Sequence, residues 1–214
     1  MSEKTGPSNG GESGARDKRA STSTPILPVL AERWSPYVLD PRPMNREHLV
    51  TVLEAARWAA SSYNEQPWRF LVAERGDAAE FSRAVDCLME ANQAWARNAS
   101  ALLFTVVSRT FARNGSPNRV AEHDLGLAMG NLCAQATALG IVVHQMGGVN
   151  LTKVRLAYQI PEGLDPVTAV ALGYLGDAAT ADEELVKRDA QPRVRRPLSE
   201  TVFAGKWGQT SPII

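Results

Sequence analysis

The chain has 214 residues, of which 44% are hydrophobic and 21% charged, as is ordinary for one soluble globular domain with or without a tail. Its 23 basic and 23 acidic residues cancel, and no long basic run occurs. This balance lacks the electrostatic footprint of a protein that binds nucleic acid, and no apolar stretch is long enough to span a membrane. We therefore expect neither nucleic acid nor membrane as a partner.

The first 25 residues are rich in Ser, Gly, Thr, Lys, Arg and Glu. Such a segment buries too little apolar surface to offset its chain entropy, and it lacks the apolar core of a signal peptide. We expect residues 1–25 to be a disordered tail and residues 26–214 to form one domain. Cys87 and Cys133 both lie inside apolar helical patterns, which predicts buried reduced thiols and a cytoplasmic location.

The first half of the domain alternates helical and strand patterns. Asn45 is placed to cap a helix whose apolar residues keep helical spacing to about residue 60. An aromatic strand is expected at about 68–73. Asp77, with Glu80 three residues later, predicts the start of a helix that runs to about Arg97. The apolar run 101–107 is typical of a buried strand.

The second half centres on one long helix. A polar loop at 109–119 precedes residues 120–139, which are apolar on most faces and end at Gly140. Such a helix belongs in a core or at a subunit interface. We expect strands at 141–143 and 167–175, with a short helix from about Thr152 between them. The irregular alternation predicts an α+β sandwich rather than a doubly wound sheet.

Polar side chains gather where the first helix ends. Ser61, Ser62, Asn64 and Gln66 could donate to and accept from a polar heterocycle. The alternative is that they are ordinary capping and turn residues.

Arginines stand near both ends of the domain, with Arg33 beside Ser35 and with Arg195 beside Arg196. A guanidinium group suits phosphate because its planar fork donates two parallel hydrogen bonds. The alternative is that all of them are solvated surface charges. The sequence does not show whether the two ends meet.

Two weaker signals lie between these ends. Gly147 and Gly148 follow a strand, where paired glycines let a flat ligand approach the backbone. The alternative is that they form an ordinary turn between a strand and a helix. Asn92 lies on an apolar helical face and points either into a site or outward. Glu122, His123 and Asp124 are interpreted as the polar edge of the long helix. No acid–base pair, nucleophile set or metal-ligand spacing stands out.

Taken together and in order, these segments resemble the FMN-dependent nitroreductase family over about residues 30–208. The matching segments are Arg33-Trp34-Ser35-Pro36, residues 55–70, Asn92, Asp124-Leu125-Gly126 with Asn131, residues 144–148, Ala171-Leu172-Gly173-Tyr174, and Arg195-Arg196-Pro197-Leu198 with Trp207-Gly208.

The resemblance implies a nitroreductase-like α+β sandwich, with a central sheet flanked by helices and a homodimer built on the long helix. It implies two FMN sites, each made by both subunits. NAD(P)H would donate hydride, and a small nitroaromatic, quinone or similar molecule would accept it in a ping-pong reaction. The missing acid–base pair fits this reading, because the flavin carries the chemistry.

The resemblance also implies roles for single residues. The phosphate would be held by Arg33, Ser35, Arg195 and Arg196, beside Trp34. The ring and its tail would contact Ser61, Ser62, Asn64, Gln66 and Asn92. Met146, Gly147 and Gly148 would pass near flavin N5, and Tyr63 and Phe111 would form the wall that faces the substrate.

Some positions depart from the family pattern. Tyr37 stands in place of a second arginine, Ala60 in place of a proline, and Trp95 in place of a cation found in some relatives; Gly148-Val149-Asn150 replaces Gly-Phe-Asp. These changes leave three alternatives open. They are a specialised flavin enzyme for dehalogenation or dehydrogenation, an FMN-binding protein without turnover, and a cofactor-free helical interaction protein. The acceptor and the choice between NADH and NADPH also stay open.

Overall fold

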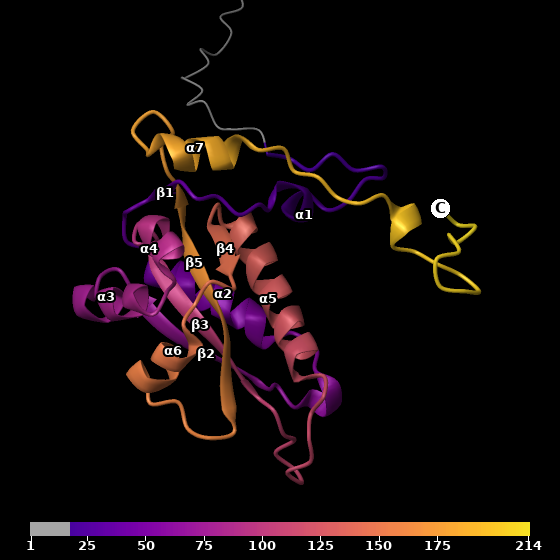
Figure 1. Ribbon diagram of the computed structural model, residues 1–214, viewed down its shortest axis with the longest axis horizontal. Coiled ribbons are helices and arrows are strands. Elements are labelled where there is room, and N and C mark those ends of the chain that lie inside the picture. The colour runs from indigo at the N-terminus through magenta and orange to yellow at the C-terminus, as the bar shows by residue number, and fades with distance from the viewer. Residues whose placement is uncertain (1–17) are drawn as a thin grey trace, which may run out of the picture.

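The computed structural model describes residues 18–214 and shows a five-stranded antiparallel sheet between layers of helices (Figure 1). The strands are β1 Leu39–Asp40, β2 Trp68–Glu74, β3 Ala101–Ser108, β4 Val142–Met146 and β5 Leu164–Leu175. The long β5 pairs with β3, with β4 and with β1, while β2 pairs with the outer side of β3.

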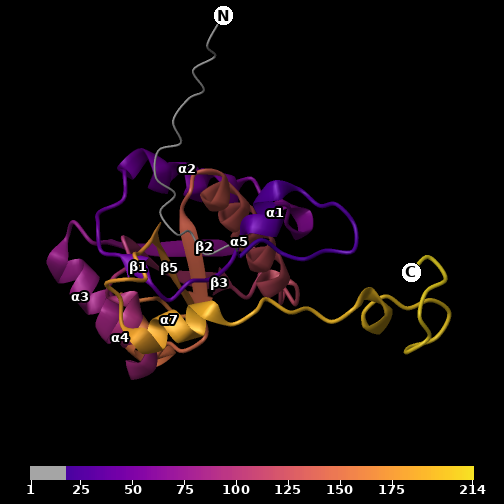
Figure 2. The same ribbon diagram turned by 90° about the horizontal axis from the view of Figure 1, so that it is seen from above.

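Helices cover both faces of this sheet. The helices α2 (Arg46–Arg57) and α5 (Ala121–Ala138) pack on one face, and α3 (Ala78–Asp86), α4 (Glu90–Ala96) and α6 (Leu151–Ala157) pack on the other. The short α1 (Pro28–Glu32) and α7 (Glu183–Ala190) lie at the same end of the molecule (Figure 1), and Figure 2 shows them apart from each other. The predicted α+β sandwich is confirmed.

The alternation of side chains along β3 explains why the sheet has two cores. Leu102, Phe104 and Val106 face the core that includes α3, α4 and α6. Leu103 and Val107 face the core that includes α2 and α5. All of these residues are buried, because a strand in the middle of a sandwich presents apolar side chains to both faces.

The sequence signals for helix ends are confirmed. The Asn45 side chain accepts a hydrogen bond from the backbone N–H of Glu47 at 2.8 Å, and Asp77 accepts one from Glu80 at 3.1 Å. Gly140 ends α5 with a φ of +69°, a conformation that favours glycine. The expected strand at 141–143 begins one residue later and continues to Met146, because residues 142–146 all pair with β5.

The prediction of one helix from Asp77 to Arg97 was wrong, because α3 ends at Asp86 and α4 begins at Glu90. The linker between them is bound to the segment that follows β4. Leu88 forms a β-bridge with Val149, and the backbone N–H of Asn150 donates to the Cys87 carbonyl at 2.8 Å. Long-range pairing therefore overrides a local helical pattern here.

The predicted disordered tail falls mainly on residues 1–17, which lie outside the described residues. Of its remaining residues, Ala20 donates its backbone N–H to the Ala31 carbonyl at 2.8 Å, and Arg19 forms an ion pair with Glu32 at 2.6 Å. These contacts attach the segment to α1. Within residues 18–214, none of the helices combines the length and the apolar character needed to cross a membrane.

The chain after α7 leaves the body of the molecule as an arm, residues 191–214 (Figures 1 and 2). Its end folds on itself, since the backbone N–H of Ser211 donates to the Val202 carbonyl at 3.0 Å and the rings of Phe203 and Trp207 lie 5.1 Å apart. Trp207 is 92% exposed. A large aromatic side chain on a projecting arm is a feature of surfaces that meet a partner.

Candidate functional site

The structure brings the two arginine-rich ends of the domain together. They line a pocket of about 200 Å³ that we call the cationic pocket. Its lining residues are Lys18, Arg33, Trp34, Ser35, Arg188, Asp189, Gln191, Arg193 and Arg195. Of the predicted phosphate ligands, Arg196 lines a neighbouring cavity of about 520 Å³ instead, together with Arg33 and Arg195.

The charges in this pocket repel one another. Burial lowers the pKa of Arg193 from its usual value, and the positive charges of Arg33 and Arg195 lower it further. The Arg33 guanidinium also donates to the Ser35 hydroxyl at 3.2 Å. Clustered guanidinium groups that disfavour one another's charge are stabilised by an anion, and a phosphate fits their planar forks.

Asp189 on α7 supports the pocket, although it was not among the residues predicted for the site. Its buried carboxylate accepts hydrogen bonds from the backbone N–H groups of Tyr37 at 2.8 Å and Val38 at 3.1 Å. It thereby attaches α7 to the segment that carries Arg33. The sequence did contain a signal for the helix that carries Asp189. Asp182 is a typical capping residue, and its side chain accepts a hydrogen bond from the N–H of Glu184 at 2.9 Å at the start of α7.

Arg193 was also missed, although it lies only two residues before Arg195 in the sequence. Its guanidinium donates to the carbonyl of Ala31 at 2.7 Å and to that of Lys18. Arg193 therefore binds the C-terminal arm to α1 and holds the two sides of the pocket in place.

Tyr37 and Trp95 meet His144 in one aromatic cluster. The Trp95 ring lies 4.4 Å from the His144 ring and 5.3 Å from the Tyr37 ring, measured between centroids. The Nδ1 of His144 donates to the Pro36 carbonyl at 2.9 Å, and burial lowers the pKa of the imidazole. These side chains pack on one another, and His144 binds the backbone three residues after Arg33.

Ser61, Ser62, Asn64 and Gln66 lie in a tight turn, the ring turn (residues 61–66), that includes a short 3-10 helix, η1 (Ser62–Asn64). Tyr63, Asn64 and Gln66 have φ values of 53°, 56° and 51°. Three left-handed residues without a glycine store strain, which is characteristic of ligand-binding segments.

The ring turn is stabilised by a hydrogen bond between its own residues and by another to α5. The Ser61 hydroxyl accepts a hydrogen bond from the N–H of Gln66 at 3.0 Å. Asp124, in the first turn of α5, accepts from the N–H of Ser62 at 3.0 Å. The interpretation of Asp124 as part of a polar helix edge was wrong, because it is only 2% exposed and anchors this turn. Glu122 and His123 do lie on the exposed edge.

The two candidates for the substrate wall are in contact. The rings of Tyr63 and Phe111 lie 5.8 Å apart in an edge-to-face arrangement of 86°. The Glu65 carboxylate accepts a hydrogen bond from the N–H of Ala112 at 2.8 Å, which joins the 109–119 loop to the ring turn.

The segments that line the cationic pocket, which are α7 and the chain after α1, lie toward one end of α5, and the ring turn lies toward the other end (Figure 1). This helix has 18 residues and is about 27 Å long. Its first turn holds Ser62 through Asp124, whereas the positive charge of Arg33 acts on Cys133 nearer the other end. The residues of the ring turn and the predicted phosphate ligands therefore do not form one site in a single chain.

Asn92 has a structural role in this fold. Its amide Nδ2 donates to the Gly148 carbonyl at 2.9 Å, and its Oδ1 accepts from the Trp95 indole at 3.2 Å. A Cβ at position 148 would overlap with this amide, whereas a Cβ at position 147 would meet nothing within 4 Å. Open space thus lies in front of Gly147, and direct contact of Asn92 with a ligand stays a prediction.

We expect Gly148→Ala to lower the free energy of unfolding by about 1–3 kcal/mol, because the new methyl group displaces the hydrogen-bonded Asn92 amide. Gly147→Ala is the matched control and should change stability little, since no atom occupies the space. Urea denaturation followed by circular dichroism measures both values. Equal stability of the two variants would contradict the bracing role of Asn92.

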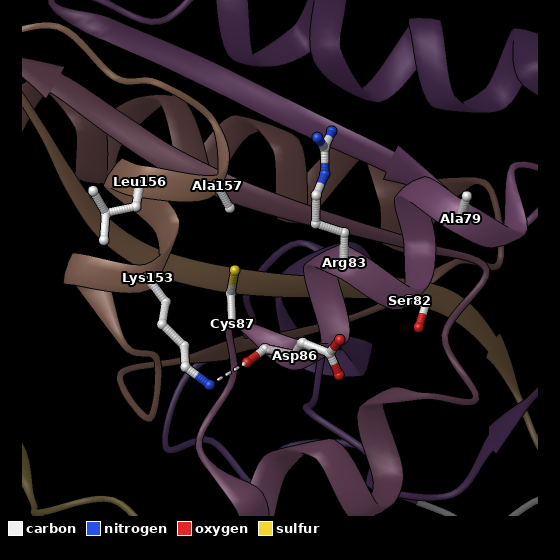
Figure 3. A pocket seen from close by; sticks show the side chains of 8 residues that line it. All are labelled: Ala79, Ser82, Arg83, Asp86, Cys87, Lys153, Leu156 and Ala157. Carbon is white, nitrogen blue, oxygen red and sulfur yellow. Dashed lines mark hydrogen bonds between the residues drawn. The ribbon is translucent and has the colours of Figure 1, made fainter.

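A separate groove of about 570 Å³ lies between α3 and α6 (Figure 3). It is lined by Ala79, Ser82, Arg83, Asp86, Cys87, Lys153, Leu156 and Ala157. Lys153 donates to the Asp86 carbonyl at 3.4 Å, and burial raises the pKa of the Cys87 thiol, which keeps it protonated. None of the predicted site residues lines this groove.

Comparison with known proteins gives a consistent result. A family model described as the nitroreductase family matches residues 30–174. An uncharacterized 15.4 kDa protein of Mycolicibacterium smegmatis is 36% identical over 149 residues, which are 65% of this chain and 97% of that protein. A crystal structure described as an oxidoreductase containing FMN is 35% identical, covers 92% of this chain and 100% of its own, and superposes with a TM-score of 0.84.

More distant similarity extends over shorter segments or over the fold alone. The major NAD(P)H-flavin oxidoreductase of Aliivibrio fischeri is 44% identical over 57 residues, 26% of either chain. A putative nitroreductase from Desulfovibrio desulfuricans, solved with FMN, is 23% identical, with a TM-score of 0.64 over 87% of this chain and 99% of its own.

Proposed function

Because this chain belongs to the nitroreductase family, we propose that it is an FMN-dependent oxidoreductase that uses NAD(P)H to reduce a small electron-poor acceptor, such as a nitroaromatic or a quinone, by a ping-pong mechanism. The observation that carries the proposal is the meeting of Arg33, Arg193 and Arg195 in one pocket. The FMN content of the relative that is 35% identical supports the choice of cofactor.

Arg33, Ser35 and Arg195 would hold the FMN phosphate, with Arg196 at the mouth of the neighbouring cavity. When bound, the flavin supplies a ring that accepts and returns hydride. The chain's own task is to bind the cofactor, to orient it and to leave one face open. Gly147 suits the edge of the ring, because no side chain stands in front of its backbone.

The ring turn would act on the flavin of a second copy, which makes the proposed enzyme a homodimer. The exposed face of α5 carries Gly126, Leu127, Gly130 and Asn131, small or apolar residues that allow close packing of two helices. If two copies pair there in antiparallel fashion, the ring turn of one approaches the cationic pocket of the other. The projecting arm with Trp207 supports the same proposal.

The free thiols support a cytoplasmic location within this proposal. Cys87 and Cys133 are both buried and unpaired with each other. Reduced cysteines are usual where glutathione and thioredoxin keep thiols reduced.

The proposal is tested by an anaerobic absorbance spectrum of the purified protein. We expect flavin bands that bleach on addition of NADPH or NADH and that return when a quinone or a nitroaromatic is added. Bands that persist with both nucleotides would favour an FMN-binding protein without turnover, or a specialised flavin enzyme. Protein that stays colourless after incubation with FMN would contradict the proposal.

A further inference from the structure

The loop at 109–119 is a braced hairpin seated on the ring turn. Thr110 forms a β-bridge with Pro117, and the backbone N–H of Phe111 donates to the Ser116 carbonyl at 2.9 Å. Gly115, with a φ of +69°, donates to the Phe111 carbonyl at 2.8 Å. The position of its tip is therefore set by its own hydrogen bonds and by the bond from Ala112 to Glu65.

The tip places a positive charge on the two aromatic rings. The guanidinium carbon of Arg113 lies 4.2 Å from the centroid of the Tyr63 ring and 5.5 Å from that of Phe111. Arginine stacked on an aromatic face keeps its N–H groups free at the edges of its plane. Tyr63 is 75% exposed, so this stacked group is open to a ligand.

Arg113 differs from its neighbour Arg109 in its partners. Arg109 forms ion pairs with Glu122 at 2.6 Å and with Asp165 at 3.0 Å, and so has a structural role. No carboxylate within residues 18–214 forms an ion pair with Arg113. The Arg113 guanidinium therefore has no ion-pair partner among the described residues.

We propose that Arg113 selects acceptors that carry an anionic group on the aromatic ring, such as a ring carboxylate. This inference rests on the proposed function and concerns the acceptor side of the same site. A flat acceptor would pack against the exposed Tyr63 and Phe111 rings, and its carboxylate would accept hydrogen bonds from the Arg113 fork. The strained backbone of Tyr63 holds its ring in place for this contact.

The test compares 4-nitrobenzoate with its neutral analogue 4-nitrobenzamide, using FMN-loaded protein. We expect the ratio of kcat/KM for the anion to that for the amide to fall about fivefold in Arg113→Gln, because one partly exposed charge pair is lost. Arg119→Gln removes an equal charge from the end of the same loop and should leave the ratio unchanged. Arg113→Lys keeps the positive charge but loses the planar fork. Its kcat/KM ratio should therefore lie between the ratio of Arg113→Gln and that of Arg119→Gln.

A binding measurement makes the test independent of turnover. Calorimetric titration of the same proteins with the two compounds should show the same loss of preference in the Kd ratio. Equal binding of the anion and the amide by the unaltered protein would overturn the inference.

The rate of anaerobic flavin bleaching separates this inference from the proposed function. It should be the same for the unaltered protein and Arg113→Gln, with NADPH and with NADH. A loss confined to bleaching by NADPH would assign Arg113 to the phosphate of the donor and overturn the acceptor assignment. Protein that binds no FMN would defeat the proposed function itself.

Discussion

Arg33→Ala is expected to raise the dissociation constant for FMN about tenfold to a hundredfold, because a charge-assisted contact to the phosphate is removed. The effect should be large, since Arg33 lines both the cationic pocket and the cavity beside it. Its loss also leaves Ser35 without the hydrogen bond at 3.2 Å. Quenching of FMN fluorescence on titration with the apoprotein measures the constant without relying on activity.

Two further variants show whether the effect of Arg33→Ala is specific to the cationic pocket. Arg46→Ala removes an exposed arginine at the start of α2, outside the pocket, and should leave FMN binding unchanged. Arg196→Ala should weaken binding less than Arg33→Ala does, because Arg196 lines only the neighbouring cavity. If Arg33→Ala bound FMN as tightly as the unaltered protein and kept its circular dichroism spectrum, the phosphate assignment would be wrong.

Mixed dimers are expected to recover flavin binding that neither parent has. One parent carries Arg33→Ala with Arg195→Ala, and the other carries Asn64→Ala with Gln66→Ala. If each site takes its phosphate ligands from one subunit and its ring ligands from the other, a mixed dimer has one intact site and one doubly altered site. In a statistical mixture of chains, about a quarter of all sites should then bind FMN.

The control for this experiment is a mixture in which both pairs of changes are on the same chain and the other chain is unaltered. In that mixture, the unaltered homodimers alone hold two intact sites, and every mixed dimer carries one pair of changes in each site. Co-expressed chains with two different affinity tags isolate the mixed species, and its FMN absorbance gives the occupancy. Mixed dimers of the two variant parents that bind no FMN would show that both sets of ligands act within one chain.

Two of the residues that were expected to depart from the family pattern, Tyr37 and Trp95, have a packing role in the fold. Tyr37, Trp95 and His144 pack on one another, and the Arg188 guanidinium lies 3.6 Å from the centroid of the Tyr37 ring. Trp95 is completely buried, so it fills space where a cation would be costly without a partner. These residues stabilise the base of the cationic pocket by packing.

Local patterns in the sequence determined most of the secondary structure. The caps at Asn45 and Asp77, the apolar strand at 101–107 and the long helix ending at Gly140 depend on residues close in the chain, and all of them are present. Such features are readable because propensity, capping and periodicity act over a few residues. The α+β sandwich followed from their order.

Contacts between distant segments were decided only by the tertiary structure. The break between α3 and α4 depends on pairing with residues 148–150, and the burial of Asp124 depends on the N–H of Ser62. The meeting of Arg33 with Arg195 depends on the contact of α1 with the start of the C-terminal arm, where Arg193 donates to the Ala31 carbonyl. No local pattern encodes these distances, because they result from the packing of the whole sandwich, and the closing of the proposed site depends on a second copy of the chain.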